Sequence, residues 1–147
     1  MSKKFTNYVL GFMFGRGAET VLLIRKNHPE FMKNKFNGIG GEIAFDESEL
    51  EAMVRTCSKE TGIETSENDW EQFATLQSRD YKVSCFVSFN NQLTEKFPEG
   101  CSYVKEEFIK VAEVSQALTF PDLLEDLKWL IPFAMECEGG EMTVTYS

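Results

Sequence analysis

An α/β or α+β sandwich is the fold class that the sequence predicts. Several short segments alternate between apolar and polar residues as half-buried strands do, and two separate segments change to a helical period. The chain has 147 residues, which is enough to bury one sizeable core. With 42% apolar and 27% charged residues, the composition excludes wholesale disorder. We therefore expect one domain over residues 1–147.

Two strands joined by a tight turn are expected at the start of the chain. Residues 5–14 and 20–26 are rich in aromatic and branched side chains, and they flank the sequence GRGAE. Residues 27–36 contain a proline and two asparagines without a clean period, which indicates a loop. A short strand at 38–45 should follow this loop.

A helix is predicted from Asp46 to Thr61. Apolar residues recur there at helical spacing and form one buried stripe, made of Leu50, Met53, Val54 and Cys57. Asp46 and Glu49 fit a capping box at the start of the helix. Gly62 fits the stop, because glycine readily takes the left-handed conformation that ends many helices.

The second half of the chain predicts more strands and one more helix. Residues 71–77 and 82–89 form a second hairpin, and a further strand is expected around 108–111. A last helix is expected in 121–136, which opens with proline and aspartate. The acidic tail, 136–147, is either an edge strand or a loose segment.

Charge and composition exclude several classes of function. The net charge of -9 repels nucleic-acid backbone, and no basic stripe offsets it, so a nucleic-acid polymer is not an expected partner. No apolar run approaches the roughly 20 residues of a membrane-spanning helix. The four cysteines are scattered, which favours reduced thiols in a cytoplasmic protein. We expect a monomer or homodimer that binds a small molecule.

The residues around the first helix suggest chemistry. Glycines precede it, Thr56, Lys59 and Glu60 fall on one side away from the apolar stripe, and Arg55 is spaced to pair with Glu47. A glycine-rich strand end followed by an acidic helix can hold a hard cation, which then attracts polyphosphate. By periodicity alone, a solvated helix face with turn glycines explains the same residues.

The spacing of these residues resembles the box of the Nudix family. That box has Gly, five residues, Glu, seven residues, Arg-Glu, an apolar residue, any residue, Glu-Glu, any residue, Gly and an apolar residue. The matching positions here are Gly41, Glu47, Arg55, Cys57, Glu60, Gly62 and Ile63. The segments NGIGGEI, EQFATL and FPDLLEDLKWLIP extend the likeness to the MutT-like branch. The resemblance implies an α/β fold, namely a Nudix-type α/β/α sandwich with a mixed β-sheet between helices.

Two positions depart from the box. Thr56 stands where the family has a glutamate that acts as general base or metal ligand, and Lys59 replaces the first glutamate of the Glu-Glu pair. A threonine offers one weak neutral oxygen, and a charged lysine does not ligate Mg²⁺. Lys59 is either a fixed cation for a substrate phosphate or a surface lysine paired with a nearby glutamate.

The resemblance also implies a cofactor and a set of site residues. The cofactor is Mg²⁺ or Mn²⁺, with few protein ligands. The implied catalytic residues are Glu60, Glu47 and Arg55. The implied metal ligands are Gly40, Glu60 and Glu106, with Glu107 as the alternative to Glu106.

A base pocket is implied by a likeness to the oxidised-purine nucleotide hydrolases of the family. The matching residues are Phe31, Asn37 and Asp122. An aromatic ring can stack on a base, while asparagine and aspartate can hydrogen-bond its edge. The alternatives are a core phenylalanine, a turn asparagine and an aspartate that caps the last helix.

Two functions remain open at this stage. The first is a hydrolase that cleaves the diphosphate linkage of a nucleoside polyphosphate, a purine nucleoside triphosphate being the expected class. The second is a catalytically impaired Nudix domain that binds a nucleotide or a protein partner. Thr56 and Lys59 favour the second function, whereas Asn37 and the other implied pocket residues favour a nucleotide ligand in both cases.

Overall fold

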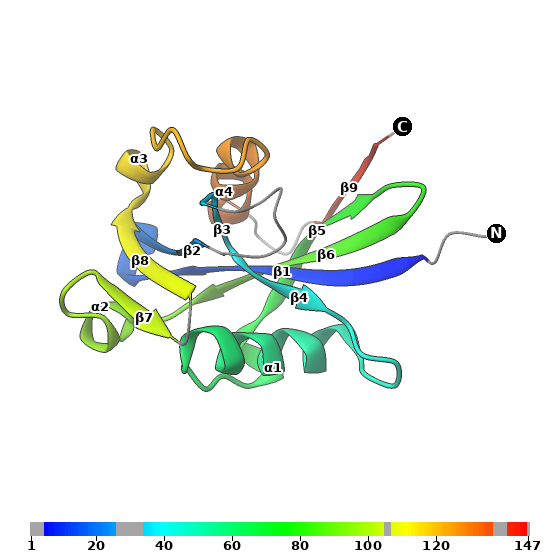
Figure 1. Ribbon diagram of the computed structural model, residues 1–147, viewed down its shortest axis with the longest axis horizontal. Coiled ribbons are helices and arrows are strands. Elements are labelled where there is room, and N and C mark those ends of the chain that lie inside the picture. Colours follow the sequence, from blue (N-terminus) through cyan, green and yellow to red (C-terminus); the bar gives the residue numbers. More distant parts are fainter. Residues whose placement is uncertain (1–4, 26–33, 105–106, 137–140, 147) are drawn as a thin grey trace.

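A mixed β-sheet with helices on both faces forms the architecture (Figure 1). The computed structural model describes residues 5–25, 34–104, 107–136 and 141–146, and within these ranges nine strands join one sheet. The strands are β1 (Thr6–Phe14), β2 (Thr20–Arg25), β3 (Phe36–Asn37), β4 (Ile39–Glu42), β5 (Glu71–Gln77), β6 (Tyr81–Phe89), β7 (Cys101–Val104), β8 (Glu107–Glu113) and β9 (Met142–Thr145). The helices are α1 (Glu49–Thr61), α2 (Leu93–Lys96), α3 (Val114–Ala117) and α4 (Leu127–Met135), with 3₁₀ turns η1 (Arg16–Ala18) and η3 (Glu67–Asp69). The predicted α/β/α fold class is confirmed.

The strand order is β7-β8-β2-β1-β6-β5-β9, with β9 at one edge. Strand β1 pairs parallel with β6, and β5 pairs parallel with β9, whereas the hairpins β1–β2 and β5–β6 are antiparallel. The tail therefore supplies an edge strand, which was one of its two predicted states.

Strands β1 and β2 diverge beyond their turn, and β3 and β4 occupy the resulting fork. The register pairs β1 with β2 at Phe14 and Val21. Further along, β4 pairs with β1 over Tyr8–Gly11, and β3 pairs with β2 at Ile24 and Arg25. The fork thus carries the glycine-rich segment into the middle of the sheet.

Gly38 is the point where the chain changes partner from β2 to β1. A Cβ atom at this position would lie 2.6 Å from the carbonyl oxygen of Gly11 and 2.9 Å from the ring of Phe12, so a side chain does not fit. The prediction of one strand at 38–45 is therefore wrong in its bounds. Two short strands form instead, and residues 43–48 make a loop.

Helix α1 begins later than predicted and ends as predicted. Its N-cap is Ser48, whose hydroxyl accepts from the N–H of Glu51, while the Glu51 carboxylate accepts from the N–H of Ser48. This capping box replaces the expected box of Asp46 and Glu49, because the chain before Ser48 is turned into the loop. At the other end Gly62 has φ 76°, the left-handed conformation that favours glycine.

The last helix also begins later than predicted. Helix α4 begins at Leu127, because the preceding backbone pairs with β3 instead of forming helical hydrogen bonds. The N–H of Phe36 donates to the carbonyl of Asp122 at 2.8 Å, and the N–H of Leu124 donates to the carbonyl of Phe36 at 3.1 Å. The prediction of a helix over 121–136 is wrong in its start, and Asp122 does not cap α4.

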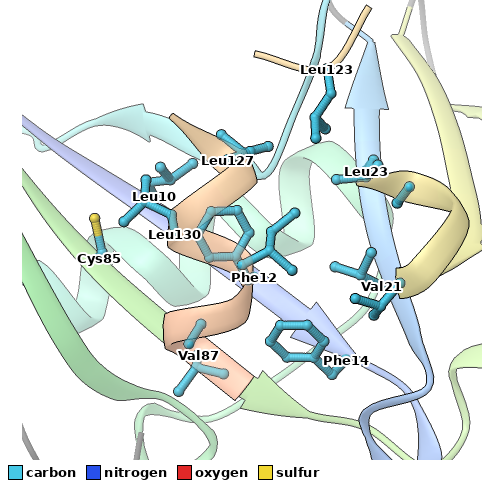
Figure 2. Close-up of a cluster of buried hydrophobic side chains, with 14 of the residues drawn as sticks. Leu10, Phe12, Phe14, Val21, Leu23, Cys85, Val87, Leu123, Leu127 and Leu130 are labelled. Carbon is cyan, nitrogen blue, oxygen red and sulfur yellow. The ribbon is translucent and has the colours of Figure 1, made fainter. Parts of the chain in front are cut away.

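Two buried clusters hold the layers together. One lies between the sheet and α4, and Figure 2 shows it with Phe12 of β1 near Leu127 and Leu130 of α4. The other lies between the sheet and α1. It contains Met53 and Cys57, both 0% exposed, while Leu50 and Val54 pack against it partly buried. The predicted apolar stripe of α1 therefore faces the sheet.

Three cysteines have described positions, and all three are free thiols: Cys57, Cys85 and Cys101. Burial raises the pKa of the Cys57 thiol, and it raises the pKa of Cys85 to about 12. Both thiols stay protonated at neutral pH. Cys137 lies outside the described residues. Among the helices in these ranges, none combines the length and the apolar character that a membrane-crossing segment requires.

Candidate functional site

The outer edge of β4 is the centre of the candidate site. The N–H of Ile43 donates to the carbonyl of Asn7 at 2.9 Å, so these residues form a hydrogen-bonded pair of the antiparallel ladder. Residues in such a ladder alternate between facing the partner strand and facing away. The backbone groups of Gly40, Glu42 and Ala44 therefore point away from β1, toward the side where α1 lies (Figure 1).

Glu47 and Arg55 bond to this edge and to each other. The Arg55 guanidinium contacts the Glu47 carboxylate at 2.6 and 2.9 Å, in a two-point pair. Arg55 also donates to the carbonyl of Glu42 at 2.9 Å, and Glu47 accepts from the N–H of Ala44 at 2.9 Å. Hydrogen bonding by Arg55 lowers the pKa of the Glu47 carboxyl, and Glu47 raises the pKa of Arg55. The pair fastens the loop before α1 to the β4 edge.

Glu60 bonds to the same edge further along. Its Oε1 accepts from the N–H of Gly40 at 3.1 Å. In an extended strand the N–H and C=O of one residue point to the same side, so the Gly40 carbonyl is directed toward the side of Glu60 as well. The structure thus brings together two of the predicted metal ligands.

Thr56 and Lys59 have different environments, although they were predicted to share one side of the helix. Thr56 is 3% exposed, and a Cβ placed on Gly41 would lie 3.0 Å from its Oγ1. Thr56 therefore packs against β4, and its predicted position away from the buried face is wrong. Its Oγ1 has no hydrogen-bond partner among the described residues. Lys59 is exposed.

The third predicted metal ligand, Glu106, lies outside the described residues. Its alternative, Glu107, is the first residue of β8. Side chains alternate between the faces of a strand, and Ile109 and Val111 pack in the α1 cluster, so Glu107 is on the α1 face with them. Within the described parts of the chain, no three Asp, Glu, His or Cys side chains gather as a metal-holding group.

A cavity of about 620 Å³ opens on the other face of the sheet, beside α4. Its walls are mainly aliphatic and aromatic, and the glycine segment contributes Asn37, Gly40 and Gly41 to them. The remaining lining residues are Tyr8, Val9, Leu10, Leu76, Tyr81, Val83, Leu124, Glu125, Asp126, Leu127, Leu130 and Tyr146. Such a lining can accommodate a ligand that has a flat apolar ring and a few polar groups at its edge.

The predicted base-binding residues are distributed unevenly around this cavity. Asn37 lines it, and the Asn37 Oδ1 accepts from the N–H of Gly38 at 2.8 Å. Asp122 precedes α4 but is not among the lining residues, and Lys59 is on α1. Phe31 lies outside the described residues.

Several lining residues were missed by sequence reasoning. Tyr8 and Tyr81 are neighbours, with ring centroids 6.5 Å apart in an edge-to-face arrangement. Tyr146 follows β9, and its O–H donates to Asp126 Oδ2 at 2.8 Å. Asp126 lies four residues beyond Asp122 in the same acidic segment, and this proximity in sequence is a weak signal. Tyr8 and Tyr81 come from separate strands and Tyr146 follows a third, and their sequence positions give no sign that they meet.

No family model and no curated protein matches the sequence. Solved structures do match the fold. A MutT structure, from a study of Aliivibrio salmonicida and Vibrio cholerae, has a TM-score of 0.66 and 15% identity, and the match covers 90% of this chain and 98% of that one. A MutT/nudix family protein from Enterococcus faecalis has a TM-score of 0.51 and 23% identity, with 60% of this chain matched to 38% of that chain.

The NUDIX domain of Shewanella oneidensis NrtR, solved with ADP ribose, has a TM-score of 0.62 and 20% identity. This match covers 92% of the chain and 88% of the domain structure. A structure of Shewanella oneidensis NrtR with a 27mer DNA also matches this chain, with a TM-score of 0.66 and 20% identity. This match covers 86% of this chain and 59% of that one. The chain therefore has the fold of the MutT and Nudix structures, as the resemblance predicted.

Proposed function

We propose that this protein binds a nucleoside polyphosphate, with a purine nucleoside triphosphate as the leading class, and hydrolyses its diphosphate linkage. The observation that carries the proposal is that Gly40 contacts both sides of the sheet. This residue lines the cavity on the α4 side, and its N–H donates to Glu60 on the α1 side. A ligand with its base in the cavity can therefore extend its phosphates past the glycines toward Glu60.

The donor set near Glu60 suits Mg²⁺ or Mn²⁺. The Glu60 carboxylate and the Gly40 carbonyl are hard oxygen ligands, and either Glu106 or Glu107 would add a third. Mg²⁺ keeps several waters and needs few protein ligands when it arrives with substrate phosphates. When bound, the cation would supply charge neutralisation on the phosphates and an activated water. Lys59 would add a fixed positive charge for a phosphate oxygen.

Glu47 and Arg55 support this site from outside it. Their bonds go to each other and to the β4 edge, at Glu42 and Ala44. We infer that they keep Gly40 in place relative to Glu60, and that they do not touch the reacting atoms. This changes their role from the catalytic one that the family resemblance implies.

The second candidate is a binding domain without turnover. It is favoured by Thr56, whose hydroxyl is buried against β4 where the family has a carboxylate. The NrtR neighbour, with its bound ADP ribose, supports a ligand of the nucleotide-diphosphate class for such a domain. In this case the cavity and the β4 edge would still hold the ligand, and the chain would report or sequester it.

The test is a panel of GTP, ATP, ADP ribose and pyrophosphate, with Mg²⁺ and with Mn²⁺. Phosphate or pyrophosphate release measures turnover, and the shift of the thermal midpoint measures binding. We expect a nucleotide to shift the midpoint and be turned over, and Glu60→Gln to lose the turnover. Glu64→Gln is the matched control, because Glu64 is exposed near the same end of α1 and bonds to Ser58. A shift without turnover would select the binding domain, and no shift with any nucleotide would refute both functions.

A further inference from the structure

A groove of about 1250 Å³ lies beside the loop that joins β4 to α1, and it is separate from the cavity near α4. Its walls come from the start of β1, this loop, the beginning of α1, the region of η3, and strands β5 and β6. In Figure 1 the loop and the start of β1 lie toward the same end of the sheet. Glu47 and Arg55 belong to the wall of the groove, whereas Gly40 and Glu60 do not. The groove is therefore a surface distinct from the proposed nucleotide site.

The floor of the groove is apolar and fixed in place. Trp70 and Phe86 line it, are both buried, and belong to the cluster between the sheet and α1. The Trp70 ring is oriented by its Nε1, which donates to Thr65 Oγ1 at 2.9 Å. Ile43 packs against the same cluster, and its N–H donates to the carbonyl of Asn7. A partner would meet a preformed surface, which lowers the ordering cost of binding.

Two phenylalanines beside this floor are left exposed. Phe45 lies in the loop and is fully exposed, and Phe5 is 45% exposed. The loop is held next to Phe45, because Glu47 accepts from the N–H of Ala44 at 2.9 Å and pairs with Arg55. A single exposed apolar side chain is ordinary on a protein surface. Two large rings beside one groove with an aromatic floor instead indicate an interaction surface.

The charged side chains of the groove are mostly acidic. They are Arg55, Glu42, Glu47, Glu49 and Glu67. Arg55 pairs with Glu47, and Lys82 lies 3.6 Å from Glu49. Among the described residues, neither Glu42 nor Glu67 has an ion-pair partner. Complementary charge steers association and sets partner choice, so the groove favours a cationic partner.

We propose that this groove docks a segment of a partner protein in which apolar side chains are flanked by lysine or arginine. The apolar side chains pack against Phe5 and Phe45 over the aromatic floor, and the basic flanks face Glu42 and Glu67. A second copy of this chain is disfavoured as the occupant, because each copy carries a net charge of -9 and brings the same sign to the groove. The inference does not depend on nucleotide binding or hydrolysis.

The experiment selects binders from a display library of random peptides on immobilised wild type and then measures the selected peptides by calorimetric titration. These peptides should be enriched in lysine and arginine around aromatic residues or leucine. Phe45→Ser should weaken their binding about tenfold or more, and Glu42→Gln with Glu67→Gln about fivefold. Raising NaCl from about 50 mM to about 500 mM should weaken binding to wild type more than to the double glutamate variant, because salt screens the exposed charges.

The matched controls are Phe89→Ser and the double variant Glu95→Gln with Glu99→Gln, because these residues are exposed and outside the groove. Thermal midpoints establish that each variant is folded. Selection of acidic or uncharged peptides, or unchanged binding by Phe45→Ser, would overturn the inference. A dimer in sedimentation that Phe45→Ser dissociates would assign the groove to a second copy instead. Binding to phosphatidylcholine vesicles that requires Phe45 would assign it to a membrane.

Discussion

The two faces of the sheet are secured in different ways. On the α1 face, charged and polar side chains bond directly to the backbone of the β4 edge, with Glu47, Arg55 and Glu60 each taking an outward-facing group. On the α4 face, the covering helix begins late and a cavity of about 620 Å³ remains beside it. On the first face, side chains bond the backbone groups at Gly40, Glu42 and Ala44, whereas the cavity on the second face has mainly apolar walls.

This difference between the two faces indicates where a ligand can bind on this fold. An exposed strand edge is a row of unpaired donors and acceptors, and here a helix and its preceding loop cover it. The same covering leaves Gly40 between the α1 layer and the cavity. A small displacement of the Gly40 backbone would therefore alter the contacts on both faces. The following variants test each face separately.

The largest effect is expected from breaking the packing of the α1 face. Met53→Asp should destabilise the fold by about 4 kcal/mol or more, because it buries an unpaired charge where Met53 is 0% exposed. Urea denaturation measures this loss. Met53→Leu is the control and should cost less than about 1.5 kcal/mol, because volume is nearly conserved. Wild-type stability of Met53→Asp would show that the assigned buried face is wrong.

A smaller effect is expected from removing a polar side chain that lines the cavity. Asn37→Ala should weaken purine nucleotide binding about tenfold or more, because a base edge loses a partner worth about 1–3 kcal/mol. Pyrophosphate binding should change little. Asn90→Ala is the matched control, since the Asn90 amide oxygen also accepts from a nearby backbone N–H but is not part of the cavity lining. Calorimetric titration of both ligands decides the outcome, and equal losses for both would exclude Asn37 from base binding.

The β4 edge should respond to the loss of its arginine. Arg55→Ala should cost about 1 kcal/mol, a value reduced by solvent exposure of the pair. The pKa of Glu47 is lowered in the folded state, so the pair stabilises fully above the ordinary carboxyl pKa of about 4.5 and loses this contribution as pH falls through the folded pKa.

Urea denaturation at pH 7 and at pH 3 measures this pH dependence. The difference between Arg55→Ala and wild type should shrink at the lower pH. The matched control is Arg79→Ala, since Arg79 is exposed in the turn between β5 and β6. A difference that is the same at both pH values would mean that the Glu47 contact does not carry the effect.

The smallest effect is expected from adding carboxylates beside Glu60. Thr56→Glu with Lys59→Glu should raise Mn²⁺ affinity about fivefold, equivalent to about 1 kcal/mol, because hard oxygen ligands are added. The gain is limited because Thr56 is packed against Gly41. Lys59→Gln is the control that removes the cation without adding a ligand. No gain in a folded double variant would indicate that Thr56 and Lys59 belong to a different working arrangement.

Local signals explain which parts of the fold and site were predictable. The stripe around Met53, the stop at Gly62 and the pairing of Glu47 with Arg55 all follow from spacing within one helix and its loop. The start of α4 did not follow from spacing. Asp122 and its neighbours carry helix-start residues, but backbone pairing with Phe36 of β3 took the groups that a helix would have used.

The sequence by itself determined the fold class, the α1 stripe and the glycine segment that contains Asn37, Gly40 and Gly41, because each depends on the pattern of a short stretch. Only the tertiary structure decided that Thr56 is buried and that Asp126 meets Tyr146. The physical reason is that strand pairing sets these contacts. Strand β9 reaches Asp126 through its pairing with β5, and β4 covers Thr56 because the fork between β1 and β2 holds it there.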